Sequence, residues 1–438
     1  MINLRLLTVL LSAALSGITV AAQRPRTVMT LEQVFEIAES HSVYLRSAAE
    51  AVREAELQKS VARAARLPEI SGSLSASYIG DGFTVKRSLS DYQRAPIPHL
   101  GTGVSVDVSQ PLYSGGAITK SIEMASLKST AARYAEELQR DNIRFRLAGY
   151  YLDLYKTVNL REVVEGNIAT ARRMLADMQI RYEQGTALKN DITRYELLIS
   201  NLGLAALKLD NTIGILNREL VSTAGMEEGT VVEPDSALLA RALPVEAEPW
   251  WQSEAARLAP SLRLADTSAE ISRTAEALAQ ADRRPKISLQ ARWTMDGPIL
   301  VEIPPINRNL SYWFVGAGVS FNLSSLYKTN KKLSAAKAAT ARSLAERDAA
   351  REDVATAVHG DYVRYLEAYE ELKTQQKSVE LACSNYLTVA ARYGSGMALI
   401  TELLDAADAK IDAEQRLVNA RINIIYYYYK LLFTSGKI

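Results

Sequence analysis

Two short segments of the chain alternate hydrophobic and polar residues, whereas the long stretches around them follow helical patterns. In RLPEISGSLSASY, residues 66–78, Ile70, Leu74 and Tyr78 point to one side and serines point to the other. A near copy, RRPKISLQARWTM, begins 217 residues later at Arg283. A period of two is that of a β-strand. The sequence therefore predicts two strands, each introduced by the pattern R-x-P-x-I-S.

A second alternating segment follows each of these strands. It reads GVSVDV from Gly103 and GVSFNL from Gly318, and loops are expected before it, at residues 80–100 and 296–309. We therefore predict one β-hairpin at about 68–112 and another at about 285–326. Their apolar faces are predicted to contain Ile70, Leu74, Val104, Val106, Ile287, Leu289, Val319 and Phe321.

Each predicted hairpin is followed by a very long helical segment, at 117–182 and 328–393. Such a helix would be about 100 Å long, more than a globular domain needs. Spacings of four and three residues alternate along the second segment, which is typical of helices wound around one another. This seam includes Cys383, which we interpret as a small core residue rather than a reactive thiol: Val358, Tyr362, Tyr365, Tyr369, Leu372, Gln376, Val379, Cys383, Tyr386, Ala390 and Tyr393.

The order of these features is the same in both halves of the chain, so we predict an internal repeat. Each half reverses direction at an R-Y-x-x-G turn and ends a last helix near a glycine, Gly225 or Gly436. We expect a signal peptide at 1–22, a first repeat at 23–225, a connecting segment at 226–249 and a second repeat at 250–438. The turns are expected at 182–188 in the first repeat and at 393–399 in the second.

Composition narrows the class of protein. An apolar run follows Arg5, and Val20 and Ala22 fit the small-residue cleavage rule, so we expect export, with an uncleaved anchor as the alternative. The single cysteine excludes an intrachain disulfide, and no cysteine follows the expected cleavage site to carry a lipid. The 51 basic and 50 acidic residues are interspersed, which gives no indication of nucleic-acid binding. No motif for catalysis, a cofactor or a structural metal emerges, so we do not expect an enzyme.

Strands with one apolar and one polar face fit either a soluble sandwich or a transmembrane barrel. The export signal and the strand lengths favour the barrel. Four strands are too few to close a ring, and an open sheet edge is not tolerated in lipid. A barrel would therefore need several copies of the chain, two for eight strands or three for twelve.

The sequence resembles the TolC-like outer-membrane efflux proteins over nearly all of the expected mature chain. The resemblance is carried by TLEQVFEIAES from Thr30, GVSVDVSQPLYSGG from Gly103, the two R-Y-x-x-G turns and the helix from Glu402 to Gly436. It departs from the family pattern at LSSLYKTNKK, residues 323–332, where the second strand-to-helix corner differs.

The resemblance implies a mainly α fold with a small β part and a homotrimer. Twelve strands, four per chain, would form one barrel among the lipids of the outer membrane, and the helices would form a barrel in the periplasm. The implied function is the passive exit duct of a tripartite efflux or type I secretion system, with a periplasmic adaptor and an inner-membrane pump as partners. A periplasmic coiled-coil adaptor or scaffold without a barrel is the alternative.

The resemblance also suggests gate residues near the two turns. Carboxylates at the positions of Glu402 and Asp405 line the closed mouth in the family, and they could bind a cation here; the alternative is a solvated helix face. Asp191 matches a carboxylate that bonds the neighbouring coil, and Tyr393 matches a gate tyrosine or ends the heptad seam.

The family's gate arginine is absent, because Ala398 takes its position. Arg194, one turn after Asp191, is a candidate partner for an acidic group of the adjacent coil. The turns themselves are the expected adaptor-docking tips, with Arg181, Tyr182, Gly185, Arg392 and Gly396.

Overall fold

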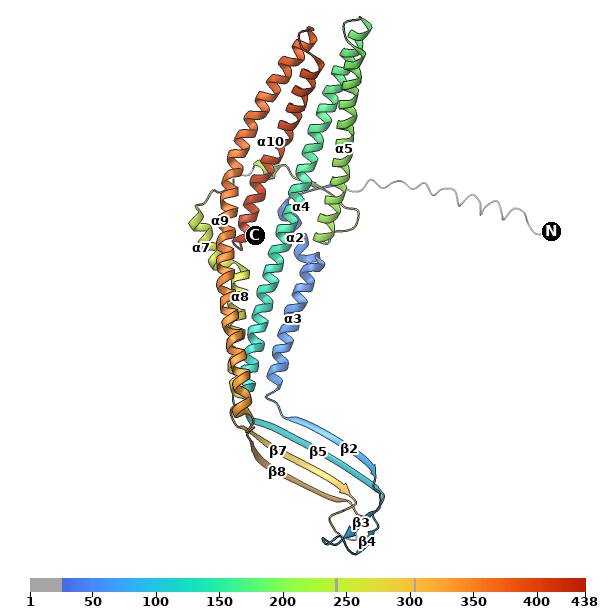
Figure 1. The fold of residues 1–438 in the computed structure, drawn as a ribbon, viewed down its shortest axis with the longest axis vertical. Coiled ribbons are helices and arrows are strands. Elements are labelled where there is room, and N and C mark those ends of the chain that lie inside the picture. The colour runs from blue at the N-terminus through green and yellow to red at the C-terminus, as the bar shows by residue number, and fades with distance from the viewer. Residues whose placement is uncertain (1–25, 241–242, 303–304) are drawn as a thin grey trace, which may run out of the picture. The chain divides into compact units, whose positions relative to one another are not determined.

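The computed structural model describes residues 26–240, 243–302 and 305–438 (Figure 1). The signal peptide predicted at 1–22 lies outside the described residues. Most of the described residues are helical and a smaller part forms strands, which confirms the predicted mainly α fold with a small β part. The helices are α2 (Leu31–His41), α3 (Val43–Ala64), α4 (Ala117–Glu183), α5 (Lys189–Ala224), α6 (Ala237–Ala240), α7 (Glu248–Leu258), α8 (Pro260–Ala281), α9 (Ser325–Gly394) and α10 (Ile400–Thr434).

The strands form one main sheet and two small pairs. They are β1 (Arg26–Met29), β2 (Glu69–Tyr78), β3 (Gly82–Val85), β4 (Tyr92–Ala95), β5 (Leu100–Tyr113), β6 (Val231–Pro234), β7 (Lys286–Gly297) and β8 (Leu310–Ser320). The main sheet has the order β2-β5-β7-β8, and every neighbouring pair in it is antiparallel.

The chain divides into two compact units that cut across the two sequence repeats. Among the described residues, the first unit consists of 26–47, 139–240, 243–259 and 354–438, and the second of 48–138, 260–302 and 305–353. Each unit therefore takes segments from both halves of the sequence.

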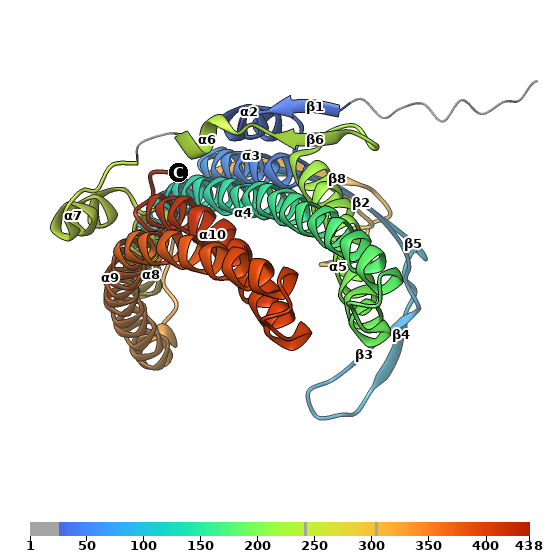
Figure 2. The same cartoon turned by 90° about the horizontal axis from the view of Figure 1, so that it is seen from above.

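In the first unit, the long helices α4, α5, α9 and α10 run alongside one another (Figures 1 and 2). The predicted seam of α9 is buried or half-buried along its length in this unit, except for the exposed Gln376. A larger core joins α2, α4 and the ends of α5 and α10, and its fully buried members include Val34, Ile143, Leu147 and Leu220.

Three of the four consecutive tyrosines of α10 pack against aromatic rings of different helices. Tyr426 lies beside Phe145 of α4, with ring centroids 5.8 Å apart. Tyr428 meets Tyr365 of α9 and Trp251 of α7, and Tyr429 meets Phe35 of α2 edge to face. A run of tyrosines that spans one helical turn can reach neighbours on every side.

A short N-terminal strand is held in the first unit by one tyrosine. Strand β1 pairs with β6 in parallel, and the hydroxyl of Tyr151 on α4 contacts the last residue of β1 and the residue that follows β6. It donates a hydrogen bond to the Met29 carbonyl (2.8 Å) and accepts one from the Asp235 amide (2.8 Å). Burial raises the pKa of Tyr151 to about 12, so the hydroxyl is protonated at neutral pH.

Two glycines at helix ends allow the chain to pass close to a neighbouring segment. Gly225 (φ 75°) ends α5, and an added Cβ there would lie 2.3 Å from the His41 carbonyl oxygen, where α2 gives way to α3. Gly436 (φ 69°) follows α10, and an added Cβ would lie 2.9 Å from the backbone of Leu258 and Ala259, between α7 and α8. The same close approach therefore occurs once in each repeat.

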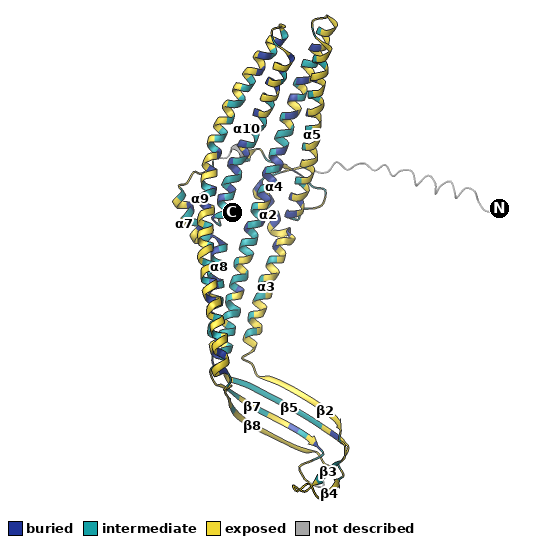
Figure 3. Ribbon diagram, in the orientation of Figure 1, coloured by how far each residue is buried: buried dark blue, intermediate teal, exposed yellow. Residues whose placement is uncertain are grey.

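The second unit contains the main sheet, and its register places polar and apolar side chains on opposite faces. Ser105 lies opposite Ser73 and Thr294, and the Arg292 guanidinium donates a hydrogen bond to the Asp107 carboxylate across β5 and β7. The other face carries mainly apolar side chains, including Leu74, Val104, Trp293 and Trp313. Strands β2 and β8 are largely exposed (Figure 3).

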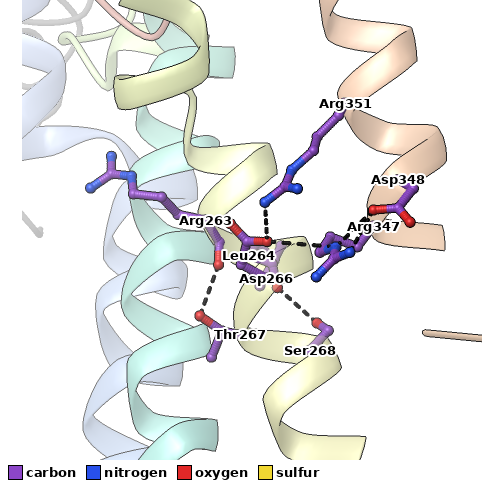
Figure 4. Close-up of polar contacts among 8 residues, drawn as sticks. All are labelled: Arg263, Leu264, Asp266, Thr267, Ser268, Arg347, Asp348 and Arg351. Atoms are coloured by element: carbon purple, nitrogen blue, oxygen red, sulfur yellow. Dashed lines mark hydrogen bonds and ion pairs between the residues drawn. The ribbon is translucent and has the colours of Figure 1, made fainter. Parts of the chain in front are cut away.

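An ion-pair cluster joins α8 and α9 within the second unit (Figure 4). The Asp266 carboxylate accepts a hydrogen bond from Arg351 (2.9 Å) and lies 4.0 Å from the Arg347 guanidinium. Arg347 also pairs with Asp348 at 2.6 Å. The cluster is partly exposed, so we expect it to contribute little to stability.

Two local expectations from the sequence are wrong. The segment 80–100 was expected to be a loop, but it contains the antiparallel pair β3–β4. Phe321 was placed on a strand, but β8 ends at Ser320. The segment 226–249, which was predicted to connect the two repeats, contains β6 and α6. In the part of the chain that the structure describes, no helix is apolar over enough residues to span a membrane.

Candidate functional site

The two helical hairpins of the first unit end in turns with the same geometry. In the first turn, the Gly185 amide donates to the Tyr182 carbonyl (2.9 Å) and the Thr186 amide donates to the Arg181 carbonyl (2.8 Å). The second turn repeats both bonds at the equivalent positions, 3.0 Å and 2.8 Å long. This is the Schellman motif, which needs a left-handed residue, and Gly185 (φ 73°) and Gly396 (φ 71°) provide it.

A hydrogen bond between side chains links the two hairpins near these turns. The Tyr393 hydroxyl on α9 donates to the Asp191 carboxylate on α5, at 3.0 Å. Tyr393 is 8% exposed, and burial followed by this bond raises its pKa to about 12. The hydroxyl is therefore a donor at neutral pH, and the residue both ends the heptad seam and bonds the other coil.

The two arginines of the R-Y-x-x-G turns have different partners. The Arg181 guanidinium crosses to the other hairpin and donates to the Gly394 carbonyl. Arg392 stays within its own hairpin, where it donates to the Met397 carbonyl (3.1 Å) and lies 3.9 Å from Glu402. Both arginines thus stabilise the second turn through hydrogen bonds to backbone carbonyls, Arg181 from the other hairpin and Arg392 from within its own.

The position of the missing family arginine lies in an apolar cluster between the hairpins. Ala398 packs at the edge of this cluster, whose buried members include Met178, Tyr195 and Leu403. Residue 398 has no charged group that could pair with Asp191, and the Asp191 carboxylate accepts its hydrogen bond from Tyr393 instead.

A polar triad crosses between α4 and α10 below the turns, and the sequence analysis did not identify it. Asn167 donates to Glu414 (2.7 Å) and accepts from Lys410 (2.9 Å), and Lys410 pairs with Glu414 at 2.9 Å. Lys410 and Glu414 are about one-fifth exposed. An asparagine within the long helical segment 117–182 was the available signal, but its partners lie 243 and 247 residues away.

The predicted acidic residues lie on an exposed side of α10. Glu402, Asp405 and Asp408 follow one another at intervals of three residues, so they share one side of the helix. Partial burial and the neighbouring Asp405 raise the pKa of Asp408. Within the described residues, Arg194 has no side-chain hydrogen bond or ion pair, and no group of three or more potential ligands is arranged to hold a metal ion.

The model of the family described as outer membrane efflux protein matches residues 34–194 and 251–426, which is most of both repeats. The chain belongs to the outer membrane efflux protein family. Its members are channel proteins, so this chain is an exit duct of the outer membrane and its helical part lies in the periplasm. No curated protein matches the chain.

Solved structures of outer-membrane channels share the fold. The outer-membrane channel OprN aligns with a TM-score of 0.78 at 19% identity, over 93% of this chain and 90% of OprN. VceC of Vibrio cholerae aligns with a TM-score of 0.77 at 16% identity, over 93% and 96%. The CmeC channel of Campylobacter jejuni aligns with a TM-score of 0.75 at 12% identity, over 93% and 85%.

Proposed function

We propose that three copies of this chain assemble into one passive duct that is gated at its helical tips. The observation that supports this proposal is that the main sheet, in the described part of one chain, has two unpaired edges and an exposed apolar face. Its edge strands, β2 and β8, have no further strand partner among the described residues, and its apolar face is exposed. Leu74 is 82% exposed and Trp313 is 73% exposed.

An isolated four-stranded sheet of this kind is unsuited to lipid, because each edge carries unpaired amide and carbonyl groups. Pairing β8 of one copy with β2 of the next satisfies those groups. Three copies give a closed ring of twelve strands, with Asp107 and Arg292 facing the lumen and the apolar side chains facing lipid. The lipid-facing set then includes Ile70, Leu74, Val104, Val106, Ile287, Leu289 and Val319.

The gate is the region where the two hairpins of one copy approach each other. The bond from Tyr393 to Asp191 and the bond from Arg181 to Gly394 hold them together. Opening requires these bonds to break. Three copies of Glu402 and Asp405 surround the axis, where they concentrate cations and bind a multivalent cation as a plug.

The tips also provide the contact with an adaptor, and the adaptor connects the duct to an energy-coupled pump in the inner membrane. The turn segments expose apolar side chains that a partner can cover, since Leu188, Met397 and Leu399 are each about two-thirds exposed. The chain itself supplies the conduit and carries out no catalysis.

The test is a planar-bilayer recording of purified protein with a multivalent cation added on the side of the helical tips. The wild-type current should be blocked, and Glu402→Ala with Asp405→Ala should weaken the block by at least about tenfold. A matched control, Asp177→Ala with Glu183→Ala, removes two exposed carboxylates from α4 near the other turn and should leave the block unchanged.

Equal block in the wild type and the acidic double variant would contradict the proposal that Glu402 and Asp405 form a cation-binding ring. Recovery of the chain without detergent as a non-conducting protein would contradict the duct and favour the periplasmic adaptor.

A further inference from the structure

A basic cleft lies in the second unit where the sheet meets α9. Its volume is about 630 Å³. It lies between the start of β7, the end of β8 and the first two turns of α9, and its wall includes Arg284, Lys286, Phe321, Ser325, Lys328 and Lys332.

The cleft carries an excess of positive charge that the chain does not neutralise. Residues 282–286 and 328–332 contain six basic residues and one acidic residue, Asp282, which pairs with Lys332 at 2.5 Å. Lys286 and Lys328 have no side-chain hydrogen bond or ion pair among the described residues. The basic side chains around the cleft repel one another. An anion bound among them would be attracted by each of them and would relieve this repulsion.

One buried hydroxyl in the cleft is also without a partner. Ser325, the first residue of α9, is 5% exposed, and its Oγ makes no hydrogen bond among the described residues. Buried hydroxyls normally have a hydrogen-bond partner, and leaving one unpaired is destabilising. Ser325 therefore offers a donor to a ligand in the cleft.

The N-terminus of α9 contributes only the electrostatic field of the helix dipole, and no free amide for a specific hydrogen bond. The Ser325 and Leu326 amides already donate to the carbonyls of Asn322 and Leu323, at 2.9 Å and 3.2 Å. The positive end of the α9 dipole still favours an anion. The specific contacts must come from Ser325 and the lysines.

The equivalent corner of the first repeat has none of these features. Residues 65–69 and 113–117 contain one basic and one acidic residue, and a tight turn at Gly115 and Gly116 starts α4. The basic corner coincides with LSSLYKTNKK, where the second half departs from the pattern of the first. The departure indicates a local requirement that the repeat itself does not impose.

We propose that this cleft binds the phosphate headgroup of an anionic phospholipid in the periplasmic leaflet of the outer membrane. The proposal rests on the proposed function, which places the sheet in lipid and α9 in the periplasm. A lipid is favoured over free phosphate because exposed apolar side chains border the cleft. Leu323 is 70% exposed, Tyr327 is 66% exposed, and Phe321 lines the cleft itself. Basic pockets between the membrane-spanning helices of other proteins bind anionic lipid headgroups by the same charge attraction.

The experiment is native mass spectrometry of the full chain in detergent, with phosphatidylglycerol or phosphatidylcholine added at equal concentration. Phosphatidylglycerol should be retained in preference. Lys286→Gln with Lys328→Gln should weaken its retention by about 30-fold, roughly fivefold for each charge. Lys286→Arg with Lys328→Arg keeps the charges and should bind as the wild type does. Lys331→Gln, next to Lys332 but outside the cleft wall, is the matched control and should have little effect.

Equal retention of the two lipids, or equal retention by the wild type and the glutamine variant, would overturn the proposal. So would displacement of phosphatidylglycerol by inorganic phosphate at a comparable concentration, since the ligand would then be the free anion. Trimer formation and conductance, measured on the same samples, test the duct separately. Conducting trimers that do not prefer phosphatidylglycerol contradict only this proposal.

Discussion

At the residue scale, Tyr393 has two roles: its ring is the last member of the heptad seam of α9, and its hydroxyl bonds the other helical hairpin. Its ring is buried among apolar side chains, and its hydroxyl reaches Asp191 of the other hairpin. A hydrogen bond to a charged group contributes about 1.5–3 kcal/mol, which is enough to shift an opening equilibrium by tenfold or more. Ala398 leaves this bond without competition from an arginine.

We expect Tyr393→Phe to raise the open fraction in planar-bilayer recordings by about tenfold, because it removes the hydroxyl and keeps the packing. The pKa of Tyr393 is raised from its usual value of 10.0 to about 12, so the contribution of its hydroxyl is complete below pH 10 and is lost as the pH rises through 12. The difference between variant and wild type should therefore stay constant from about pH 6 to about pH 9.

Tyr182→Phe is the matched control, since Tyr182 is at the other turn, is 45% exposed and makes no side-chain hydrogen bond among the described residues. A variant that conducts no more than the wild type would show that the Tyr393–Asp191 bond does not hold the closed state.

At the element scale, the pair β1–β6 depends on a side chain from a helix. Two strands of four residues cannot stabilise each other alone. Tyr151 of α4 bonds Met29 of β1 and the Asp235 amide directly after β6, and that amide is also 3.2 Å from the Met29 carbonyl. The pairing is therefore a property of the assembled first unit.

Tyr151→Phe should loosen β1 without unfolding the helices, since the lost bonds amount to about 1–2 kcal/mol. We expect amide exchange in β1 to become about tenfold faster, measured by mass spectrometry on peptic peptides. Tyr150→Phe is the matched control, because the neighbouring tyrosine packs on the same core without a side-chain hydrogen bond among the described residues. Unchanged exchange in Tyr151→Phe would show that side-chain packing alone retains the strand.

At the scale of the whole molecule, the main sheet is incomplete in one chain. Its register joins the hairpin of one repeat to the hairpin of the other through β5 and β7. The remaining edges and the apolar face have no internal partner among the described residues. The proposed trimer would provide both, through the neighbouring strands and the lipid.

The two faces of β2 allow a direct test of this arrangement. Leu74→Arg would place a charge toward lipid near the middle of the strand and should destabilise the assembly by about 2–4 kcal/mol. Ser75→Arg would place the same charge toward the lumen and should be tolerated. The measurement is the fraction of heat-resistant trimer in outer-membrane extracts. Equal loss in both variants would contradict the assignment of the faces.

The sequence by itself determined the periodic features of the fold. Alternation predicted the four long strands, and the seam of four and three predicted the long helix α9, because both patterns reflect which face of a local element avoids water. The two R-Y-x-x-G turns could also be predicted from the sequence, because the left-handed backbone conformation of such a turn favours glycine whatever lies around it. The family resemblance suggested that Asp191 bonds the neighbouring coil, but it identified neither Tyr393 as its partner nor the bond from Arg181 to Gly394.

The tertiary structure decided the partnerships between distant residues. Asn167 and Glu414 are separated by 247 residues, and Tyr393 and Asp191 by 202, so no local pattern indicates that they meet. The short pairs β1–β6 and β3–β4 were missed because four residues carry too little periodicity. The basic cleft was visible only as a departure from the repeat. It became a candidate site once folding had placed Arg284 and Lys286 beside Lys328 and Ser325, since charge density depends on distance in space.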